Sequence, residues 1–263
     1  MYYYDTDRLN MIREKLTGIY ESCKNNFDAL NKEAKKRTAD KSIWCGNWID
    51  PYSRDHITEI FDNTTDQRKI LKRKPADRTD KSLHMYENGV PVVSEYYGEK
   101  GELTLKKFNI PQDGGMTGIS YDLRQKQIYD ITVEIINENS ECDELYHMLI
   151  LNGVTEIRAR KYYYENGCIK SAAAMDEYDI DKQILLYDDP MYDNTGRILS
   201  RGQLPMNPSY VCDYEFIYGD DGYPEAFTRK NYSYGSEVTH TWKIKKGIMK
   251  RYIEYGIYSF FRK

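Results

Sequence analysis

The sequence predicts a mainly β protein of the α+β class, in which an N-terminal amphipathic helix packs on a large antiparallel meander sheet of Tyr-rich hairpins. Three observations support this: an apolar stripe at helical spacing near the N-terminus, period-two alternation with frequent turns from residue 83 onward, and 26 tyrosines in 263 residues. Tyrosine favours strands and supplies a large apolar ring, so a core is expected although the mean hydropathy is −0.79. We divide the chain into a helical and connecting region, 1–82, and a hairpin domain, 83–263.

The predicted helix runs from about residue 6 to residue 37. Asp5, Thr6 or Asp7 can cap its start, and lysines and an arginine crowd its last turns, where cations complement exposed carbonyls. Only about three heptads are present, so we expect packing on the protein's own sheet rather than a coiled coil. The apolar stripe recurs every three or four residues and consists of Leu9, Ile12, Leu16, Ile19, Cys23, Phe27 and Leu30.

The hairpin domain is marked by turn sequences that end in glycine after Asn, Asp, Lys or Thr, which is typical of tight hairpins with positive φ. Four of its glycines are separated by 29, 26 and 25 residues, about two strands and two turns, and form a loose repeat: Gly167, Gly196, Gly222 and Gly247. The turn segments are Tyr86–Gly89, Tyr97–Gly101, Tyr164–Gly167, Tyr192–Gly196 and Tyr218–Gly222. A meander of roughly ten or more strands is expected, as one curved sheet or a split sandwich.

Residues 38–82 are interpreted as a connecting region with partial order. Seven cations and two carboxylates between Arg68 and Lys81 leave a local excess of five positive charges. With aromatic residues nearby, this segment is a candidate platform for nucleic acid or an acidic protein partner, and a charged helix with a solvated linker is the alternative. The candidate contact residues here are Trp44, Trp48, Tyr52, Arg68, Lys69, Lys72, Arg73 and Lys74.

Two short strings resemble known bacterial repeat families. The string from Tyr162 to Ser171 resembles the hairpin units of MORN-like repeat proteins, a group that includes antitoxin-type proteins. The string from Tyr192 to Arg201 is similar to the YD repeat of Rhs-type proteins. Each likeness covers about ten residues, the period is irregular, and neither extends to residues 1–82. The resemblance implies a bacterial hairpin-repeat architecture and, from the first family, an immunity or antitoxin role.

No sequence-local catalytic or metal-binding motif is found. The histidines lie at least 28 residues apart, and HExxH and G-x-S-x-G patterns are lacking, so we expect no metal and no cofactor. The Gly-rich stretch Asp113–Gly118 lacks the ending of a phosphate loop and is predicted to be a wide turn. The acidic runs Glu138–Glu144 and Asp176–Asp181 are predicted to be solvated loops.

The first ten residues hold no apolar run, and the five cysteines are odd in number with no CxxC pair, so we expect a cytoplasmic protein with free thiols. Formal net charge is −4, which disfavours a protein devoted to coating phosphates.

Consecutive tyrosines in a strand face opposite sides of a sheet, so the run Tyr162–Tyr164 predicts an aromatic outer face, with Tyr162 and Tyr164 as candidate contacts. We therefore expect a macromolecule-binding protein that is not an enzyme, namely an immunity- or antitoxin-type inhibitor of a toxin-like protein. One alternative is a carbohydrate-active or other hydrolytic enzyme with carboxylates from separate strands. A second is nucleic-acid binding through residues 43–81.

Overall fold

The fold is seen in a computed structural model, which describes residues 6–46, 70–151, 154–165, 168–178, 210–220, 224–231 and 238–243. The four glycines of the loose repeat, the turn Tyr192–Gly196 and the Rhs-like string from Tyr192 to Arg201 lie outside these ranges.

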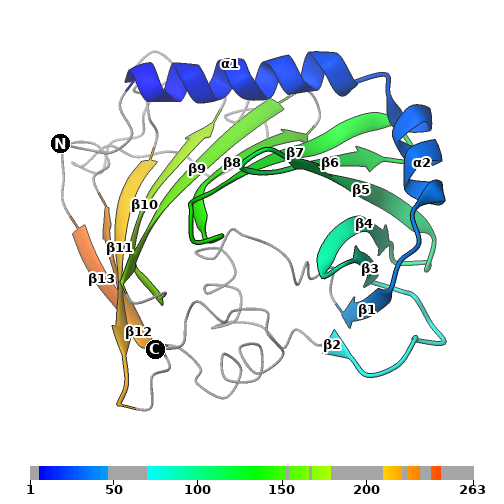
Figure 1. The fold of residues 1–263 in the computed structure, drawn as a ribbon. Helices are drawn as coiled ribbons and strands as arrows, with labels where there is room; N and C mark the ends of the chain where they lie inside the picture. The colour runs from blue at the N-terminus through cyan, green and yellow to red at the C-terminus, as the bar shows by residue number, and fades with distance from the viewer. Residues whose placement is uncertain are drawn as a thin grey trace.

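One antiparallel sheet of 13 strands dominates the described chain, in the order β13-β12-β11-β10-β9-β8-β7-β6-β5-β4-β3-β1-β2. It curves into an arch (Figure 1). From β3 to β13 every strand pairs with its neighbours in sequence, which confirms the predicted meander as a single sheet. The strands are β1 (Lys41–Gly46), β2 (Ile70–Leu71), β3 (Lys81–Glu87), β4 (Val90–Tyr97), β5 (Leu103–Gln112), β6 (Gly115–Asp122), β7 (Gln127–Ile136), β8 (Cys142–Leu151), β9 (Val154–Glu165), β10 (Cys168–Tyr178), β11 (Tyr210–Tyr218), β12 (Pro224–Asn231) and β13 (Val238–Lys243).

Two strands of the N-terminal region belong to the same sheet. β1 pairs with β3, for example Lys41 with Tyr86, and β2 pairs with the other edge of β1. A boundary between residues 82 and 83 would therefore cut through β3 and separate hydrogen-bonded strands.

The N-terminal helix is two helices, α1 (Thr6–Cys23) and α2 (Phe27–Lys36). The chain breaks at Asn26, whose side-chain amide donates to the carbonyl of Ser22 at 2.7 Å and so competes with the helical backbone pattern. The Tyr121 hydroxyl donates to the Cys23 carbonyl at 2.6 Å, which satisfies one acceptor at the end of α1. The break allows α2 to turn along the curve of the sheet (Figure 1).

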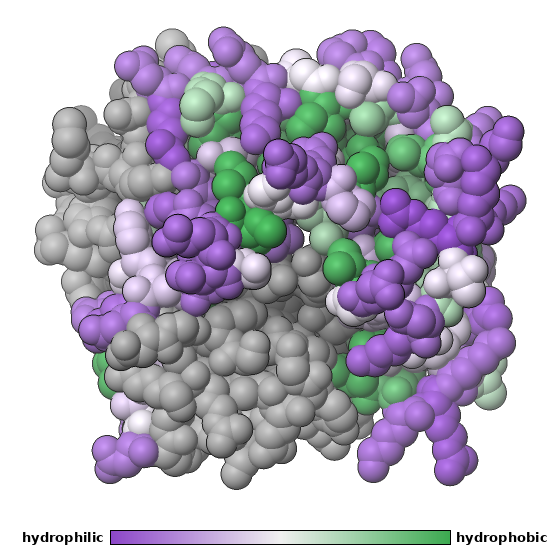
Figure 2. All heavy atoms as spheres, in the orientation of Figure 1, coloured by the Kyte–Doolittle hydropathy of each residue, from purple (hydrophilic) through white to green (hydrophobic). Residues whose placement is uncertain are grey.

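Both helices lie on the convex face of the arch and bury the predicted stripe. Leu9, Ile12 and Leu16 are fully buried, and the rest of the stripe packs partly buried on the same core. Below them runs an apolar row that crosses seven strands through paired positions: Met85, Val93, Phe108, Ile119, Ile131, Met148 and Ile157. In Figure 2 hydrophobic residues show between α1 and the strands, while the outer surfaces of both helices are hydrophilic.

Aromatic and polar contacts tie the helices to the sheet at both ends. Phe27 of α2 meets Phe108 and Tyr121 edge to face, with ring centroids 5.9 and 5.3 Å apart. At the other end Arg8 of α1 pairs with Glu144 at 2.5 Å, and the Tyr146 hydroxyl donates to the same carboxylate at 2.6 Å. Burial, and then this hydrogen bond, raise the pKa of Tyr146. The prediction that Glu144 belongs to a solvated loop is therefore wrong, because β8 begins at Cys142 and buries it.

The predicted hairpin turns are confirmed where they are described. Asn88 and Gly89 have φ of 53° and 77°, as a two-residue turn of the I′ type requires. The Gly-rich stretch differs from its prediction as a wide turn, because only Asp113 and Gly114 lie between β5 and β6. Gly115 opens β6 in close contact with β7, since a Cβ built there would lie 1.9 Å from the Glu134 carbonyl oxygen.

Replacing Ile12 by alanine tests the core below α1. Because Ile12 is 0% exposed, Ile12→Ala should lower the free energy of unfolding by about 2–5 kcal/mol in urea titrations. The neighbouring Met11 is 49% exposed, and Met11→Ala should change it by no more than about 0.5 kcal/mol. Equal effects of the two substitutions would contradict the placement of α1.

Substitution by alanine should change the free energy of unfolding in opposite directions at two glycines, Gly115 and Gly18. Gly115→Ala forces a methyl group against the β7 backbone and should cost about 1–3 kcal/mol or more. Gly18→Ala on α1 meets no atom within 4 Å and should stabilise by up to about 1 kcal/mol, because alanine favours the helix. Thermal unfolding of both variants measures the difference, and a tolerated Gly115→Ala would show that β6 and β7 do not approach this closely.

Candidate functional site

Polar residues form two rows on the concave face of the sheet, opposite the helices. Strand alternation places two cross-strand polar rows beside the apolar row but on the other side of the sheet. One polar row is His84, Ser94, Lys107, Ser120 and Asp130, and the other is Asn109, Gly118, Thr132, His147 and Arg158. Side chains on this face also contact one another: His147 Nε2 lies 3.9 Å from an Asp130 carboxylate oxygen, and Arg158 pairs with Glu156. None of these ten residues is exposed, and His84, Ser94, Ser120 and Asn109 are buried, so the rows themselves offer little accessible surface.

The histidine of the first polar row is part of the folded interior. His84 is fully buried, and its two ring nitrogens hydrogen-bond the hydroxyls of Ser94 at 2.8 Å and Ser82 at 2.9 Å. Its ring meets Tyr96 edge to face at 5.7 Å. Serine and histidine side chains are adjacent here, but their full burial keeps substrate away from them. The hydrogen bonds of His84 therefore hold β3 and β4 together and form no catalytic site.

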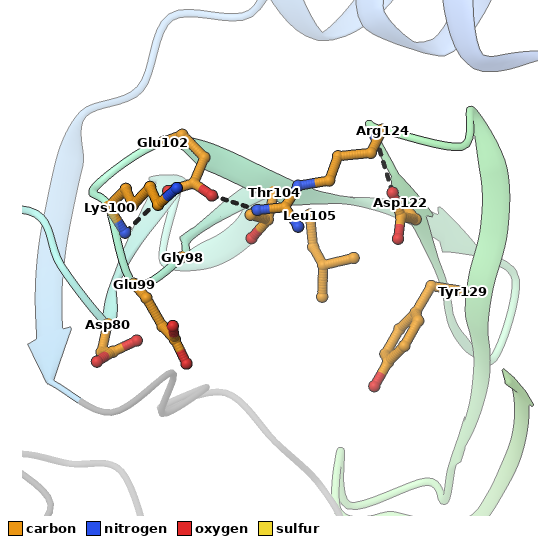
Figure 3. Close-up of a pocket in the computed structure, with 10 residues that line it drawn as sticks. All are labelled: Asp80, Gly98, Glu99, Lys100, Glu102, Thr104, Leu105, Asp122, Arg124 and Tyr129. Carbon is orange, nitrogen blue, oxygen red and sulfur yellow. Dashed lines mark hydrogen bonds and ion pairs between the residues drawn. The ribbon is translucent and has the colours of Figure 1, made fainter.

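A pocket opens on this face where the β4–β5 loop meets the β6–β7 turn (Figure 3). Its volume is about 1060 Å³, just above the range of roughly 300–1,000 Å³ usual for small-molecule sites. It combines an apolar patch with charged groups from the β4–β5 loop, the β6–β7 turn and the residue before β3. The lining residues are Asp80, Gly98, Glu99, Lys100, Glu102, Thr104, Leu105, Asp122, Arg124 and Tyr129.

Two β-bulges build the pocket wall. Between β4 and β5 the register shifts so that Thr104 has no opposing partner, and between β6 and β7 the same happens at Tyr129. Both residues line the pocket. An extra residue in one strand re-aims its side chain and increases the local twist. The bulges therefore explain why the Tyr129 ring points into the cavity in Figure 3.

The charged groups of the two loops are held by specific donors. Asp122 accepts the backbone N–H groups of Arg124 at 2.8 Å and Gln125 at 3.0 Å. The Arg124 guanidinium pairs with Glu102, which also accepts the Lys100 N–H at 3.0 Å. The pKa of Glu102 lies below its ordinary value, chiefly because backbone N–H groups donate to the carboxylate and then because of Arg124. The Glu102 carboxylate is thus kept ionised.

The pocket carries a negative field. Its four carboxylates (Asp80, Glu99, Glu102, Asp122) exceed its two cations (Lys100, Arg124) by two charges. Burial raises the pKa of the Tyr129 hydroxyl, and the nearby carboxylate of Asp130 adds to the rise, which Arg158 opposes. Among the described residues no cluster of three or more His, Cys, Asp or Glu side chains is arranged to hold a metal ion.

The residues predicted as contacts from sequence lie in separate places. Trp44 is 8% exposed and stacks on Tyr97 with centroids 5.7 Å apart, and the Arg78 guanidinium lies over both rings. Lys72, Arg73 and Lys74 are exposed in the β2–β3 loop, where nucleic-acid binding stays a prediction. Trp48, Tyr52, Arg68 and Lys69 fall outside the part of the chain that the structure describes.

The tyrosines of the run Tyr162–Tyr164 alternate between the two faces of β9, as predicted, but the exposed ring is not one of the two predicted contacts. Tyr162 is 1% exposed and packs in the interior, so its ring offers no contact surface. Tyr164 is half-buried and donates its hydroxyl to the Cys142 carbonyl at 2.7 Å. Tyr163, at 41% exposed, is the accessible ring of the three. The pocket residues were missed by sequence reasoning, although the turn Tyr97–Gly101 was predicted, because bulges and turn contacts bring them together.

Comparison with protein-family models and with curated proteins finds no match. Among solved structures, a porin-like protein from Bacteroides vulgatus aligns at 11% sequence identity and a TM-score of 0.34, covering 70% of this chain and 95% of that one. In the described part of this chain, neither helix is long and apolar enough to cross a membrane.

The Arg124–Glu102 pair can be tested by titration. Because the folded-state pKa of Glu102 is lowered, its contribution to stability is present above the unfolded pKa, near 4.5, and is lost as pH falls through the folded pKa. Arg124→Gln should raise the Glu102 pKa in an NMR titration of carboxyl carbons, but not fully to 4.5, since the backbone donors remain. Arg13→Gln on α1 is the control, and an unchanged Glu102 pKa in Arg124→Gln would show that the pair does not form in solution.

Proposed function

We propose that this chain is a protein-binding module without catalytic activity, an immunity- or antitoxin-type inhibitor that engages a toxin-like partner through the pocket on its concave face. The observation that carries this proposal is a polar pocket whose charges are already oriented: Arg124 fixes Glu102, and two turn amides fix Asp122. Pre-oriented groups lose little conformational freedom on binding, which favours affinity.

The same geometry weighs against a hydrolase as the first choice. A glycoside hydrolase needs one carboxyl group with a raised pKa to act as general acid. Glu102 has a lowered pKa and an arginine partner. One carboxylate oxygen of Asp122 accepts hydrogen bonds from two backbone N–H groups. These carboxylates suit charge contacts better than proton transfer.

The proposed contact surface is the pocket, whereas the sequence-based hypothesis placed it on an aromatic outer face of the sheet. Tyr121 and Tyr146 lie buried under the helices, and Tyr162 is buried as well, so few described rings are free to form an aromatic docking face. The pocket offers a concave surface with both apolar and charged groups, as binding sites commonly do.

A pair of Tyr→Ala variants separates the two surfaces. The full chain is used to capture a partner from the native host, and the purified partner is then titrated with wild type, Tyr129→Ala and Tyr163→Ala. We expect a stoichiometric complex that blocks the partner's toxicity on co-expression, with affinity reduced about tenfold or more by Tyr129→Ala and hardly by Tyr163→Ala.

Two results would count against the proposal. A monomeric chain that captures no stoichiometric protein and protects no cell would remove the inhibitor function. Greater loss with Tyr163→Ala than with Tyr129→Ala would return the contact to the outer face, where strand alternation places Tyr163. Turnover of an oligosaccharide that is abolished by Glu99→Gln would favour the hydrolase instead.

A further inference from the structure

We infer that the pocket receives a basic side chain, an arginine or lysine from an extended segment of the partner. This inference rests on the proposed function and adds the chemical class of the group that is bound. It stands on three observations: an open cavity, carboxylates at its rim without ionic partners, and an aromatic and aliphatic wall next to them.

The rim carboxylates are available to a ligand. Asp80 and Glu99 are exposed and form no ion pair or side-chain hydrogen bond with any residue in the described part of the chain. Both line the pocket, as Figure 3 shows. Two carboxylates at the mouth of one cavity can accept the forked donors of a guanidinium or the donors of an ammonium group.

The cations of the pocket do not neutralise this rim. Arg124 is paired with Glu102, and Lys100 is the other cation of the lining. An anionic ligand would meet the excess of two negative charges, whereas a cationic ligand would be attracted by it. The net negative charge of the lining therefore favours a positively charged ligand.

The wall suits the stem of a long basic side chain. Leu105 supplies an aliphatic surface, and the half-buried Tyr129 ring supplies an aromatic face that can attract a cation. A cavity of about 1060 Å³ is larger than one side chain, so flanking residues of the partner can enter with it. The ligand is thus a basic segment rather than a free ion.

The test uses short blocked peptides and the full, isotope-labelled chain. One peptide carries two arginines separated by glycine, and its matched control carries citrulline, which keeps the shape and removes the charge. We expect the arginine peptide to shift the amide signals of Gly98, Gly101 and Arg124, to bind more weakly as salt rises, and to exceed the citrulline peptide at least threefold in affinity.

Matched double variants locate the effect. Asp80→Asn with Glu99→Gln removes the rim charges, and asparagine tolerates the φ of 50° at residue 80. Asp113→Asn with Glu138→Gln removes the same charge at the opposite ends of the strands. The first pair should weaken arginine-peptide binding at least threefold and the second should leave it unchanged.

Several outcomes would overturn the inference: no binding of the arginine peptide at millimolar concentration, equal binding of both peptides, shifts confined to other surfaces, or equal loss in both double variants. Its failure differs from failure of the proposed function. If the captured partner binds the Asp80→Asn/Glu99→Gln chain as tightly as wild type, the inhibitor function stands and the basic-segment inference falls. If no partner binds wild type, the proposed function falls first.

Discussion

Burial of the apolar row under α1 and α2 is the interaction on which the rest of the structure depends. A single antiparallel sheet has no core of its own, because its side chains alternate between two faces and one of them must be covered. Leu9, Ile12 and Leu16 each contribute about 1.5–3 kcal/mol by leaving water, and the row beneath them contributes in the same way. With this core on the convex side, the alternate strand positions that point to the concave side can be polar or charged.

The polar face and the pocket follow from that division. Paired positions one residue away from the apolar row point to the other side, which is where Lys107, Asp130 and Arg158 lie. Regular pairing alone would give a smooth polar surface. The bulges at Thr104 and Tyr129 interrupt it at neighbouring strand ends, and the two loops with their carboxylates close around the interruption. The site is thus made by irregularities in an otherwise regular meander.

The sequence predicted most of what depends on periodicity. The helical stripe, the hairpins of the described residues and the Asn88–Gly89 turn follow from spacing and local turn chemistry, and the structure confirms them. The turns Tyr164–Gly167, Tyr192–Gly196 and Tyr218–Gly222 lie wholly or partly outside the described residues. It did not predict the break at Asn26, because a side-chain bond to Ser22 leaves the apolar spacing intact. It misread Glu144 as solvated, because its partner Arg8 lies 136 residues away in the chain.

The pocket was beyond sequence reasoning for a related reason. A bulge adds one residue to one strand only, and nothing in the residues around Tyr129 shows that the partner strand lacks a counterpart. Tyrosine runs must present a ring on each face of a sheet, which predicts Tyr162 as a contact, yet the pattern does not tell which face is covered. Burial of Tyr162 and exposure of Tyr163 were decided by packing.

The hydrogen-bond and ion-pair partners of the pocket carboxylates indicate which chemistry the pocket suits. A carboxylate that transfers protons must be able to accept and release one near working pH, which needs an environment that disfavours its charge. Glu102 has the opposite environment, because backbone amides and then Arg124 favour its ionised form. Glu102 therefore acts as a fixed charge. Negative charge beside an apolar wall in an open cavity suits recognition of a cationic group, and the proposed binding role rests on this arrangement.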